Sequence, residues 1–195
     1  MEKYTSHRFE KNTLGSDIVE DLKGLERKCG VTLEKPVTLY RGEIRPADKT
    51  TEADLQVVSC DIGDCITSWS TSPARASYYS THLIHNATPN QNQTFSHSHS
   101  VLYCTTFPKG TRVLPMHGME NEVLLVGRPR VTYDQKVATA DIEQLFALNE
   151  TDDDEYDYAL KHDILKFHKS WKSGYAHIVS GTLLDVDGKE ILHHR

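Results

Sequence analysis

The distribution of helical and strand patterns along the chain predicts a single domain of the α+β class. Stretches in which apolar residues recur with helical spacing lie among shorter runs rich in β-branched and aromatic residues, which are typical of strands. Because the two kinds of segment do not alternate regularly, the α+β class is favoured. The chain has 195 residues, which is enough to bury roughly two-thirds of its unfolded surface in one core.

The expected helices are marked by start and stop signals. Ser16 can cap a first helix that ends at Gly30. Ser72 followed by Pro73 is a strong start signal, because a capping hydroxyl precedes proline at the first helical position. A late helix opens with acidic residues and closes with lysines, which suits the helix dipole. The expected helices are residues 16–30, residues 73–84, a short helix from residue 139, and residues 152–171.

The expected strands lie between these helices. Gly42 is expected to end the first strand, and Gly63 to interrupt the second. Residues 1–15 are expected to form a polar tail, and residues 43–55 and 86–98 to form loops. The expected strands are residues 37–41, 57–71, 100–107, 111–114, a run that ends at 126, residues 130–133, and a hairpin of 175–185 with 189–192.

Charge and the N-terminal sequence limit the location and the partners. The formal net charge is −6 with both signs interspersed, so there is no general attraction to nucleic acid or to an anionic membrane. This balance argues against duplex DNA as a partner without excluding a local basic groove. The first residues lack the apolar core of a signal peptide, and no apolar run approaches the length of a membrane span. We therefore expect a cytoplasmic protein with no membrane partner.

Cysteine, histidine and acidic residues do not form a recognisable metal motif. The four cysteines fit neither a zinc ribbon nor a dense disulfide scaffold, so reduced structural thiols are expected. Residues 152–155 are acidic but lack the spacing of a calcium loop. The histidines nearest one another are expected to be solvated loop residues rather than zinc ligands: His82, His85, His97 and His99. No metal is predicted.

Three short motifs, widely spaced and each at a predicted strand, carry the functional prediction. They are Tyr40-Arg41-Gly42, Ser70-Thr71-Ser72 and Glu120-Asn121-Glu122. Two carboxylates separated by one residue on a strand project from the same face, roughly 7 Å apart at the Cα atoms. A fixed cation, a hydroxyl cluster and a carboxylate pair suit a reaction on a phosphate-bearing substrate in which positive charge forms at a sugar carbon.

The order Arg, then Ser-Thr-Ser, then Glu-x-Glu resembles the arginine-directed mono-ADP-ribosyltransferases of the cholera-toxin-like branch. The length and the lack of an export signal look most like the small phage-encoded members that modify host proteins. The resemblance runs from about Val37 to Val126. Each motif alone recurs by chance, but all three in this order and strand context form a fairly specific signal.

The resemblance also implies a fold and partners. Members of the family have two small sheets packed as a split β-sandwich, with the substrate NAD in the cleft between them. By resemblance, residues 1–195 form one such domain, with residues 139–174 as a helical insertion before the last strands. The implied partners are host bacterial proteins that bear an acceptor arginine, and a monomer is expected.

The resemblance implies catalytic roles for three residues. Glu122 matches the catalytic glutamate, which stabilises the oxocarbenium-like ribose and holds a ribose hydroxyl. Glu120 matches the position typical of arginine-directed members, where a carboxylate orients the acceptor guanidinium and helps to remove its proton. Ser70 matches the serine that positions the catalytic glutamate by hydrogen bonding.

Contacts with NAD are likewise implied by the resemblance. Arg41 matches the strand arginine that holds the phosphates or the adjacent ribose, and its planar fork suits a diphosphate. Thr71 and Ser72 look more structural, in sheet packing and as the helix cap respectively, and Trp69 looks like a core residue. The acceptor-recognition loop corresponds to residues 115–119. The implied NAD-binding residues are Arg41, Tyr40, Gly42, Ser70, Thr71, Ser72, Phe95 and Glu122, with Phe95 stacking on nicotinamide from a mobile loop.

Three alternatives remain open at this stage. The protein could be an NAD glycohydrolase that uses water as the acceptor. It could be an inactive module that binds NAD or a partner, although the intact three motifs argue against this. It could also transfer ADP-ribose to a nucleic acid, because related enzymes modify bases or NAD-capped RNA.

Overall fold

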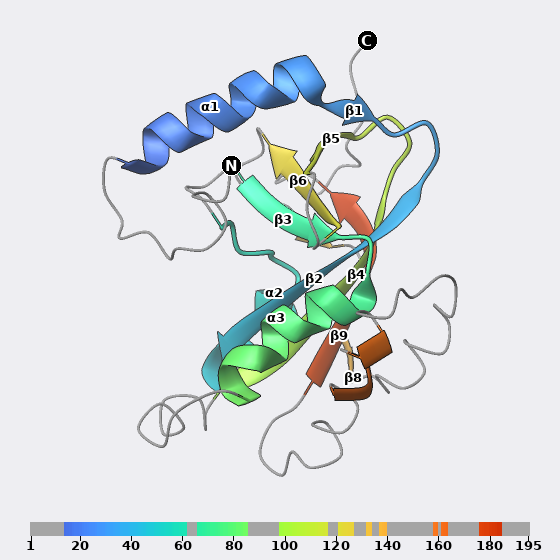
Figure 1. Ribbon diagram of the computed structural model, residues 1–195. Helices are drawn as coiled ribbons and strands as arrows, with labels where there is room; N and C mark the ends of the chain where they lie inside the picture. The colour runs from blue at the N-terminus through green and yellow to red at the C-terminus, as the bar shows by residue number, and fades with distance from the viewer. Residues whose placement is uncertain are drawn as a thin grey trace.

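The computed structural model describes residues 14–61, 66–85, 98–116, 121–126, 132–133, 137–139, 158–159, 161–163 and 176–184. This part of the chain is a mixture of helices and mainly antiparallel strands, which confirms the α+β class (Figure 1). The helices are α1 (Leu14–Cys29), a 3-10 turn (Ala47–Lys49), α2 (Glu52–Leu55) and α3 (Pro73–His85). The strands are β1 (Val31–Thr32), β2 (Val37–Pro46), β3 (Ile66–Ser70), β4 (Ser98–Phe107), β5 (Arg112–Pro115), β6 (Glu122–Val126), β7 (Thr132–Tyr133), β8 (Val137–Thr139) and β9 (Ala176–Leu184).

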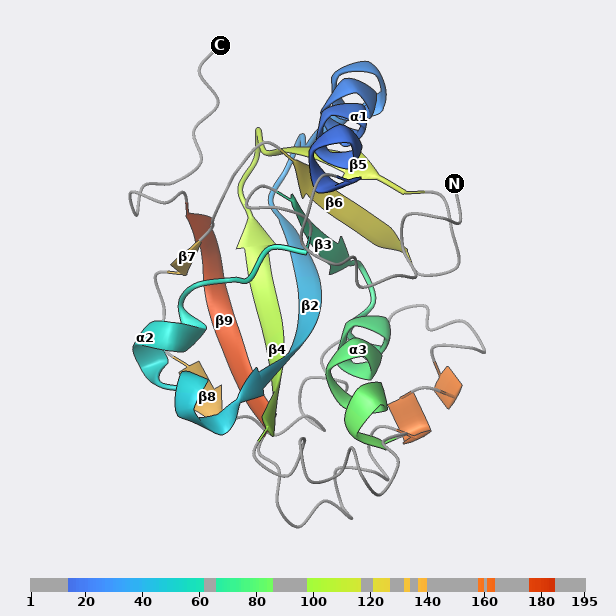
Figure 2. The ribbon, with the colours of Figure 1, turned by 90° about the vertical axis from the view of Figure 1, so that its left-hand side faces the viewer.

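The strands follow the order β1-β5-β6-β3-β2-β4-β9-β7, with β8 also paired to β9. β2 pairs with β4 along its whole length, from Val37 to Pro46. In contrast, β2 and β3 share a single pair, Tyr40 with Ser70. The sheet therefore divides at this junction into two groups of strands, and Figure 2 shows β3, β6 and β5 running at an angle to β2, β4 and β9. The two groups remain joined through the Tyr40–Ser70 pair as one hydrogen-bonded strand order, whereas two separate small sheets were expected.

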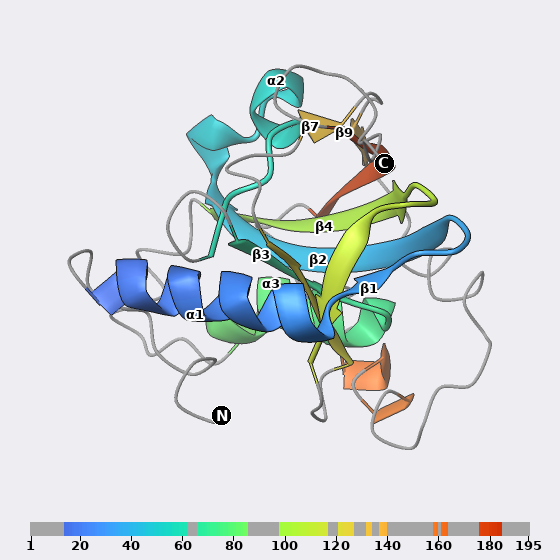
Figure 3. The same cartoon turned by 90° about the horizontal axis from the view of Figure 1, so that it is seen from above.

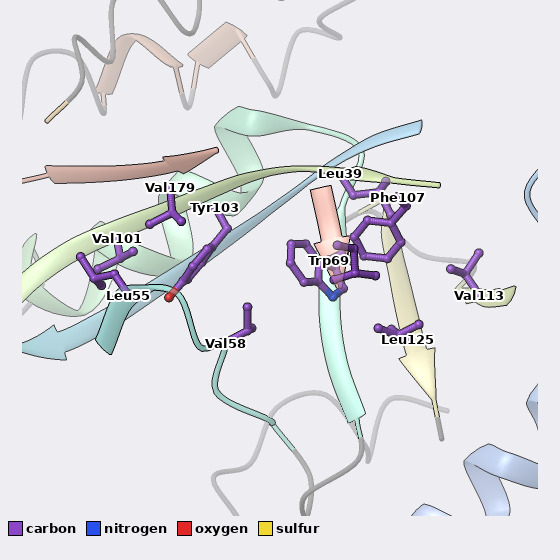
Figure 4. Close-up of a cluster of buried hydrophobic side chains, with 11 residues drawn as sticks. Leu39, Leu55, Val58, Trp69, Val101, Tyr103, Phe107, Val113, Leu125 and Val179 are labelled. Atoms are coloured by element: carbon purple, nitrogen blue, oxygen red, sulfur yellow. The ribbon is translucent and has the colours of Figure 1, made fainter. Parts of the chain in front are cut away.

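The main hydrophobic core lies on one face of these strands, beneath α2 (Figure 4). Trp69 packs edge-on against Phe107 with ring centroids 4.9 Å apart, and its Nε1 donates to Thr67 Oγ1. The prediction that Trp69 is a core residue is therefore confirmed. The buried side chains of this core are Leu39, Leu55, Val58, Trp69, Val101, Tyr103, Phe107, Val113, Leu125, Val179 and Leu183.

The helices α1 and α3 cover the opposite face, and α2 lies on the other side of the strands (Figure 3). Ile18 and Leu22 of α1 pack in a second cluster with apolar residues of β3, β5 and β6. The helix ends before Gly30, as predicted, but it begins at Leu14. The prediction that Ser16 caps it is wrong, since Ser16 lies inside the first turn. The part of the chain that the structure describes contains no helix long and apolar enough to span a membrane.

The helix α3 begins where the sequence predicts. Ser72 Oγ accepts a hydrogen bond from the Arg75 backbone N–H at 3.2 Å, which is the expected cap. The prediction that Gly42 ends its strand is wrong, because β2 continues to Pro46. Instead, Gly42 lets α3 approach closely, since a Cβ atom there would lie 1.8 Å from the Ala76 carbonyl oxygen.

Other element predictions differ in extent. Among the described residues of the expected strand over 57–71, the strand is β3. The expected loop over 43–55 contains the end of β2, the 3-10 turn and α2. Thr51 and Asp54 form a capping box at α2, in which each side chain accepts from the backbone N–H of the other. Thr139 ends β8, and the residues of the short helix expected from residue 139 lie outside the described residues. Residues 158–159 and 161–163 are helical, and residues 14 and 15 of the predicted tail belong to α1. Residues 1–13, the rest of the predicted insertion after residue 139, and the final strand lie outside the described residues.

Parallel pairing of β4 with β9 brings two histidines together. His99 Nδ1 lies 3.0 Å from His177 Nε2 and 3.1 Å from Thr50 Oγ1. The prediction that His99 is a solvated loop residue is wrong, because it lies half-buried within β4. One proton can bridge the two neutral rings, whereas two protonated rings would direct positive N–H groups at each other. Burial lowers the pKa of His99, and burial together with the charge of His99 lowers the pKa of His177.

This pair predicts a loss of stability in mild acid. A histidine with a lowered pKa in the folded state binds protons first in the unfolded state, so stability falls as pH drops through the ordinary value of about 6.5. Urea unfolding at about pH 7.5 and about pH 5.5 measures the effect. We expect the wild type to lose more free energy of unfolding between these values than His177→Gln. An equal loss in both proteins would show that the pair does not sense pH.

Candidate active site

The three sequence motifs meet at the junction between β2 and β3. Tyr40 is the register partner of Ser70, and Ser70 is in turn the register partner of Glu122. Residues from three distant parts of the chain thus form one row across three neighbouring strands. Tyr40 lies within β2, Ser70 ends β3 and Glu122 begins β6, so the backbone of each of these residues is held by the sheet.

Arg41 is buried beside this row, with 7% of its surface exposed. Its Nε donates to Glu43 Oε1 at 2.8 Å. Nη1 donates to Asp61 Oδ2 at 2.6 Å and to the Ser68 carbonyl at 2.8 Å. Nη2 donates to the Ser59 carbonyl at 2.9 Å and to Asp61 Oδ1 at 2.8 Å. A guanidinium has five N–H donors, and all five are engaged by oxygen atoms of the protein.

Electrostatics keep Arg41 charged. Burial alone would lower the pKa of Arg41, but the charges of Asp61 and Glu43 outweigh that penalty and raise the pKa above its ordinary value. Glu43 is itself buried and also pairs with Arg45, with Arg45 Nη2 2.8 Å from Glu43 Oε2. Because every donor of Arg41 is in use, a substrate phosphate would have to replace one of these protein contacts.

An open cavity of about 230 Å³ lies along the edge of β2 beyond the junction. Arg41 and Gly42 line it, whereas Tyr40, Ser70 and Glu122 do not. Tyr40 instead packs beneath α3, where its side chain is 5% exposed. The residues lining the cavity are Arg41, Gly42, Glu43, Ile44, Ser59, Cys60, Asp61 and Tyr79.

Glu122 is the first residue of β6 and is held by a serine that the motif did not include. Ser68 Oγ donates to Glu122 Oε1 at 2.6 Å. Ser68 and Ser70 occupy alternate positions of β3 and therefore share a face with Glu122. This alternation was visible in the sequence and could have identified Ser68. Asp61 and Glu43 were also missed, because no local pattern links them to Arg41.

The Ser-Thr-Ser motif connects the end of β3 to the start of α3. Ser70 Oγ accepts from the Ser72 backbone N–H at 3.0 Å, and Ser72 in turn caps the helix. Thr71 was expected in sheet packing, which is wrong, because it follows the strand and is exposed. Its backbone N–H donates to the Asn121 carbonyl at 3.2 Å, which ties the second motif to the third.

The Glu-x-Glu motif is less regular than the sequence suggested. The strand begins at Glu122, and Asn121 has a φ of 48°, in the left-handed region that asparagine tolerates. Only Glu122 of the two glutamates lies in the described strand, so their placement on one face stays a prediction. Glu120 and Phe95 lie outside the described residues, as does most of the acceptor-recognition segment, of which only residues 115 and 116 are described.

Metal ligands and disulfides can be assessed only where the chain is described. Within the described ranges, no group of three or more His, Cys, Asp or Glu side chains is placed to hold a metal ion. Cys29 and Cys104 carry free thiols, and burial raises the pKa of the Cys104 thiol.

Comparisons with known proteins give matches only among solved structures. No protein-family model and no curated protein sequence matches the chain. Vis toxin, an ADP-ribosyltransferase from Vibrio splendidus, is 14% identical with a TM-score of 0.45, over 94% of this chain and 66% of that chain. Vis in complex with agmatine is 14% identical with a TM-score of 0.47, over 97% of this chain and 74% of that one. The ADP-ribosylating toxin BECa of C. perfringens, with NADH, is 10% identical with a TM-score of 0.42, over 92% of this chain and 38% of that chain. The chain thus spans just under two-thirds of the first of these proteins.

Proposed function

We propose that the protein is a mono-ADP-ribosyltransferase that cleaves the nicotinamide–ribose bond of NAD and transfers ADP-ribose to arginine side chains of proteins. One observation carries the proposal. Tyr40, Ser70 and Glu122, one residue from each motif, lie in one row at the junction of the two groups of strands, where the Ser68 hydroxyl donates to the Glu122 carboxylate. The same residues scattered over separate surfaces would have excluded a common site.

The chemistry follows from the placement of Glu122. When the bond between the ribose C1′ and the nicotinamide nitrogen breaks, its electron pair leaves with nicotinamide and positive charge develops at C1′. A fixed carboxylate stabilises that charge and accepts a hydrogen bond from a ribose hydroxyl. The hydrogen bond from Ser68 holds the carboxylate before the substrate arrives, so little reorganisation is needed during the reaction.

Arginine as the acceptor rests on Glu120. A guanidinium is protonated at neutral pH and is a poor nucleophile. In the proposed reaction its nitrogen attacks C1′ and gives up a proton, and a carboxylate close to Glu122 both orients the group and removes that proton. We propose host bacterial proteins as the targets, a monomer acting in the cytoplasm, and NAD as the substrate with no metal.

Labelling tests the reaction and the acceptor together. The purified protein is incubated with biotinylated NAD and a bacterial lysate, and labelled side chains are mapped by mass spectrometry. We expect labels on arginine. Labels on asparagine, cysteine or nucleobases would overturn the acceptor assignment while leaving the transferase. Free ADP-ribose released at equal rates with and without acceptor protein would identify a glycohydrolase, and no consumption of NAD would leave only a binding module.

A further inference from the structure

We infer that Asp61 is a positioning residue, which holds Glu122 in place through Ser68 and with the help of Arg41. The inference rests on the proposed function, because Glu122 is the residue whose placement is at stake. Asp61 belongs to none of the three motifs, and it lies in the segment before β3. Its side chain is 38% exposed, so it borders solvent while contacting buried groups.

The first step is the contact between Asp61 and the backbone of β3. Asp61 Oδ2 accepts a hydrogen bond from the Ser68 backbone N–H at 2.7 Å. The same carboxylate receives two hydrogen bonds from the fork of Arg41, at 2.6 and 2.8 Å. A bidentate pair between a guanidinium and a carboxylate fixes the orientation of both groups.

The second step is the contact between Arg41 and the carbonyl of Ser68. Its Nη1 also donates to the Ser68 carbonyl at 2.8 Å. In an antiparallel strand, the N–H and C=O of one residue point to the same edge. On the β2 side of β3, strand pairing is limited to Ser70. The Asp61–Arg41 pair therefore satisfies the backbone of Ser68 at the edge where β2 diverges from β3.

The third step is the side chain of Ser68. Its Oγ donates to Glu122 Oε1 at 2.6 Å, a charge-assisted hydrogen bond. The position of this hydroxyl depends on the backbone that carries it, and that backbone is held at both of its polar groups. Asp61 thus acts on Glu122 through Ser68, which contacts both carboxylates. The same arrangement explains why Arg41 has no donor left over, since its five hydrogen bonds hold the site together.

This role predicts a defect in turnover rather than in substrate binding. Asp61→Asn keeps the shape of the side chain but directs an amide N–H₂ at donors. We expect kcat to fall about 30-fold while KM for NAD changes less than about twofold, because small misplacements of catalytic groups cost up to about 100-fold in rate. Asp61→Glu, which keeps the charge on a longer side chain, should retain more activity than Asp61→Asn.

The matched control is Asp54→Asn. Asp54 is a carboxylate in the preceding helix that accepts hydrogen bonds from Thr51 in the capping box. Its side chain has no described contact with Ser68 or Glu122. We expect this variant to lower the melting temperature slightly and to leave kcat unchanged. A loss of kcat in Asp54→Asn equal to that in Asp61→Asn would attribute both to general destabilisation and overturn the inference.

A double-mutant cycle isolates the pathway through Ser68. In a Ser68→Ala background the hydroxyl is absent, so Asp61→Asn should slow kcat by less than a further twofold or so. A fully additive effect would overturn the inference, as would a raised KM for NAD with an unchanged kcat, which would indicate substrate binding. An active wild type with an equally active Asp61→Asn would overturn the inference alone. A wild type that does not consume NAD would overturn the proposed function and the inference together.

Discussion

Glu122→Ala is expected to reduce transfer of labelled ADP-ribose from NAD by about 1,000-fold. The variant removes the charge that stabilises the developing oxocarbenium ion, and loss of one such stabilising group costs about 100- to 1,000-fold in rate. Stability should change by no more than about 1 kcal/mol, because Glu122 is half-buried at the start of its strand and a typical hydrogen bond, such as that from Ser68, contributes about that much. Initial rates with labelled NAD and urea unfolding measure the two quantities.

Two further variants separate charge from shape. Glu122→Gln keeps the size of the side chain and an oxygen that can accept from Ser68, but it removes the charge. It should be nearly as slow as Glu122→Ala if the charge stabilises the transition state. Glu20→Ala removes an exposed glutamate of α1 and should leave transfer unchanged. Transfer by Glu122→Ala within tenfold of the wild type would end the assignment of Glu122 as the catalytic residue.

Arg41→Ala is expected to lower the free energy of unfolding by about 3 kcal/mol, because removing one member of a buried ionic network leaves its partners uncompensated. Glu43 is 8% exposed and would lose one of its two arginines. Asp61 would lose both hydrogen bonds from the Arg41 guanidinium, although water can replace part of them because its side chain is partly exposed. The Ser59 and Ser68 carbonyls would lose their donors as well. Urea unfolding at neutral pH measures the change.

Arg112→Ala is the matched control for Arg41. Arg112 also pairs with a glutamate, Glu26 of α1, but its side chain is 38% exposed. Exposed ion pairs contribute up to about 1 kcal/mol, so this variant should be clearly less destabilised. Arg41→Lys should lie between the two, since an ammonium offers three donors where the guanidinium offers five. Equal stability of Arg41→Ala and Arg112→Ala would show that the network around Arg41 does not hold the fold together.

Much of the fold could be predicted because it depends on local chemistry. Ser72 and Pro73 specify the start of α3 through a cap and a fixed φ angle, and the structure confirms that start. The strands β4, β5 and β6 follow runs of apolar residues, and their observed bounds lie within two residues of the predicted ones. Trp69 was recognised as a core residue from its place in a strand. Errors fell where tertiary contacts override the local signal. Gly42 lies within β2, and glycine is needed there because α3 packs directly against it rather than because the strand ends.

The candidate site was only partly predictable. The motif residues Arg41, Ser70 and Glu122 were chosen by resemblance, and their meeting at one junction depends on the register of three strands. Ser68 could have been found by alternation along β3, whereas nothing local connects Asp61 to Arg41. The left-handed φ of Asn121 was equally hidden, because asparagine adopts either conformation and its neighbours decide which.

By itself, the order of residues determined where α3 begins, which faces of strands are apolar, and which polar groups accompany them. These properties arise from hydrogen bonds and side-chain periodicity within a few residues. Only the tertiary structure decided that Arg41 donates all five of its hydrogen bonds to oxygens of residues 43, 59, 61 and 68, and that Ser68, which lies outside the motif, donates to Glu122. A buried donor is satisfied by whichever acceptor the folded chain brings within about 3 Å, and that choice depends on segments far apart in the sequence.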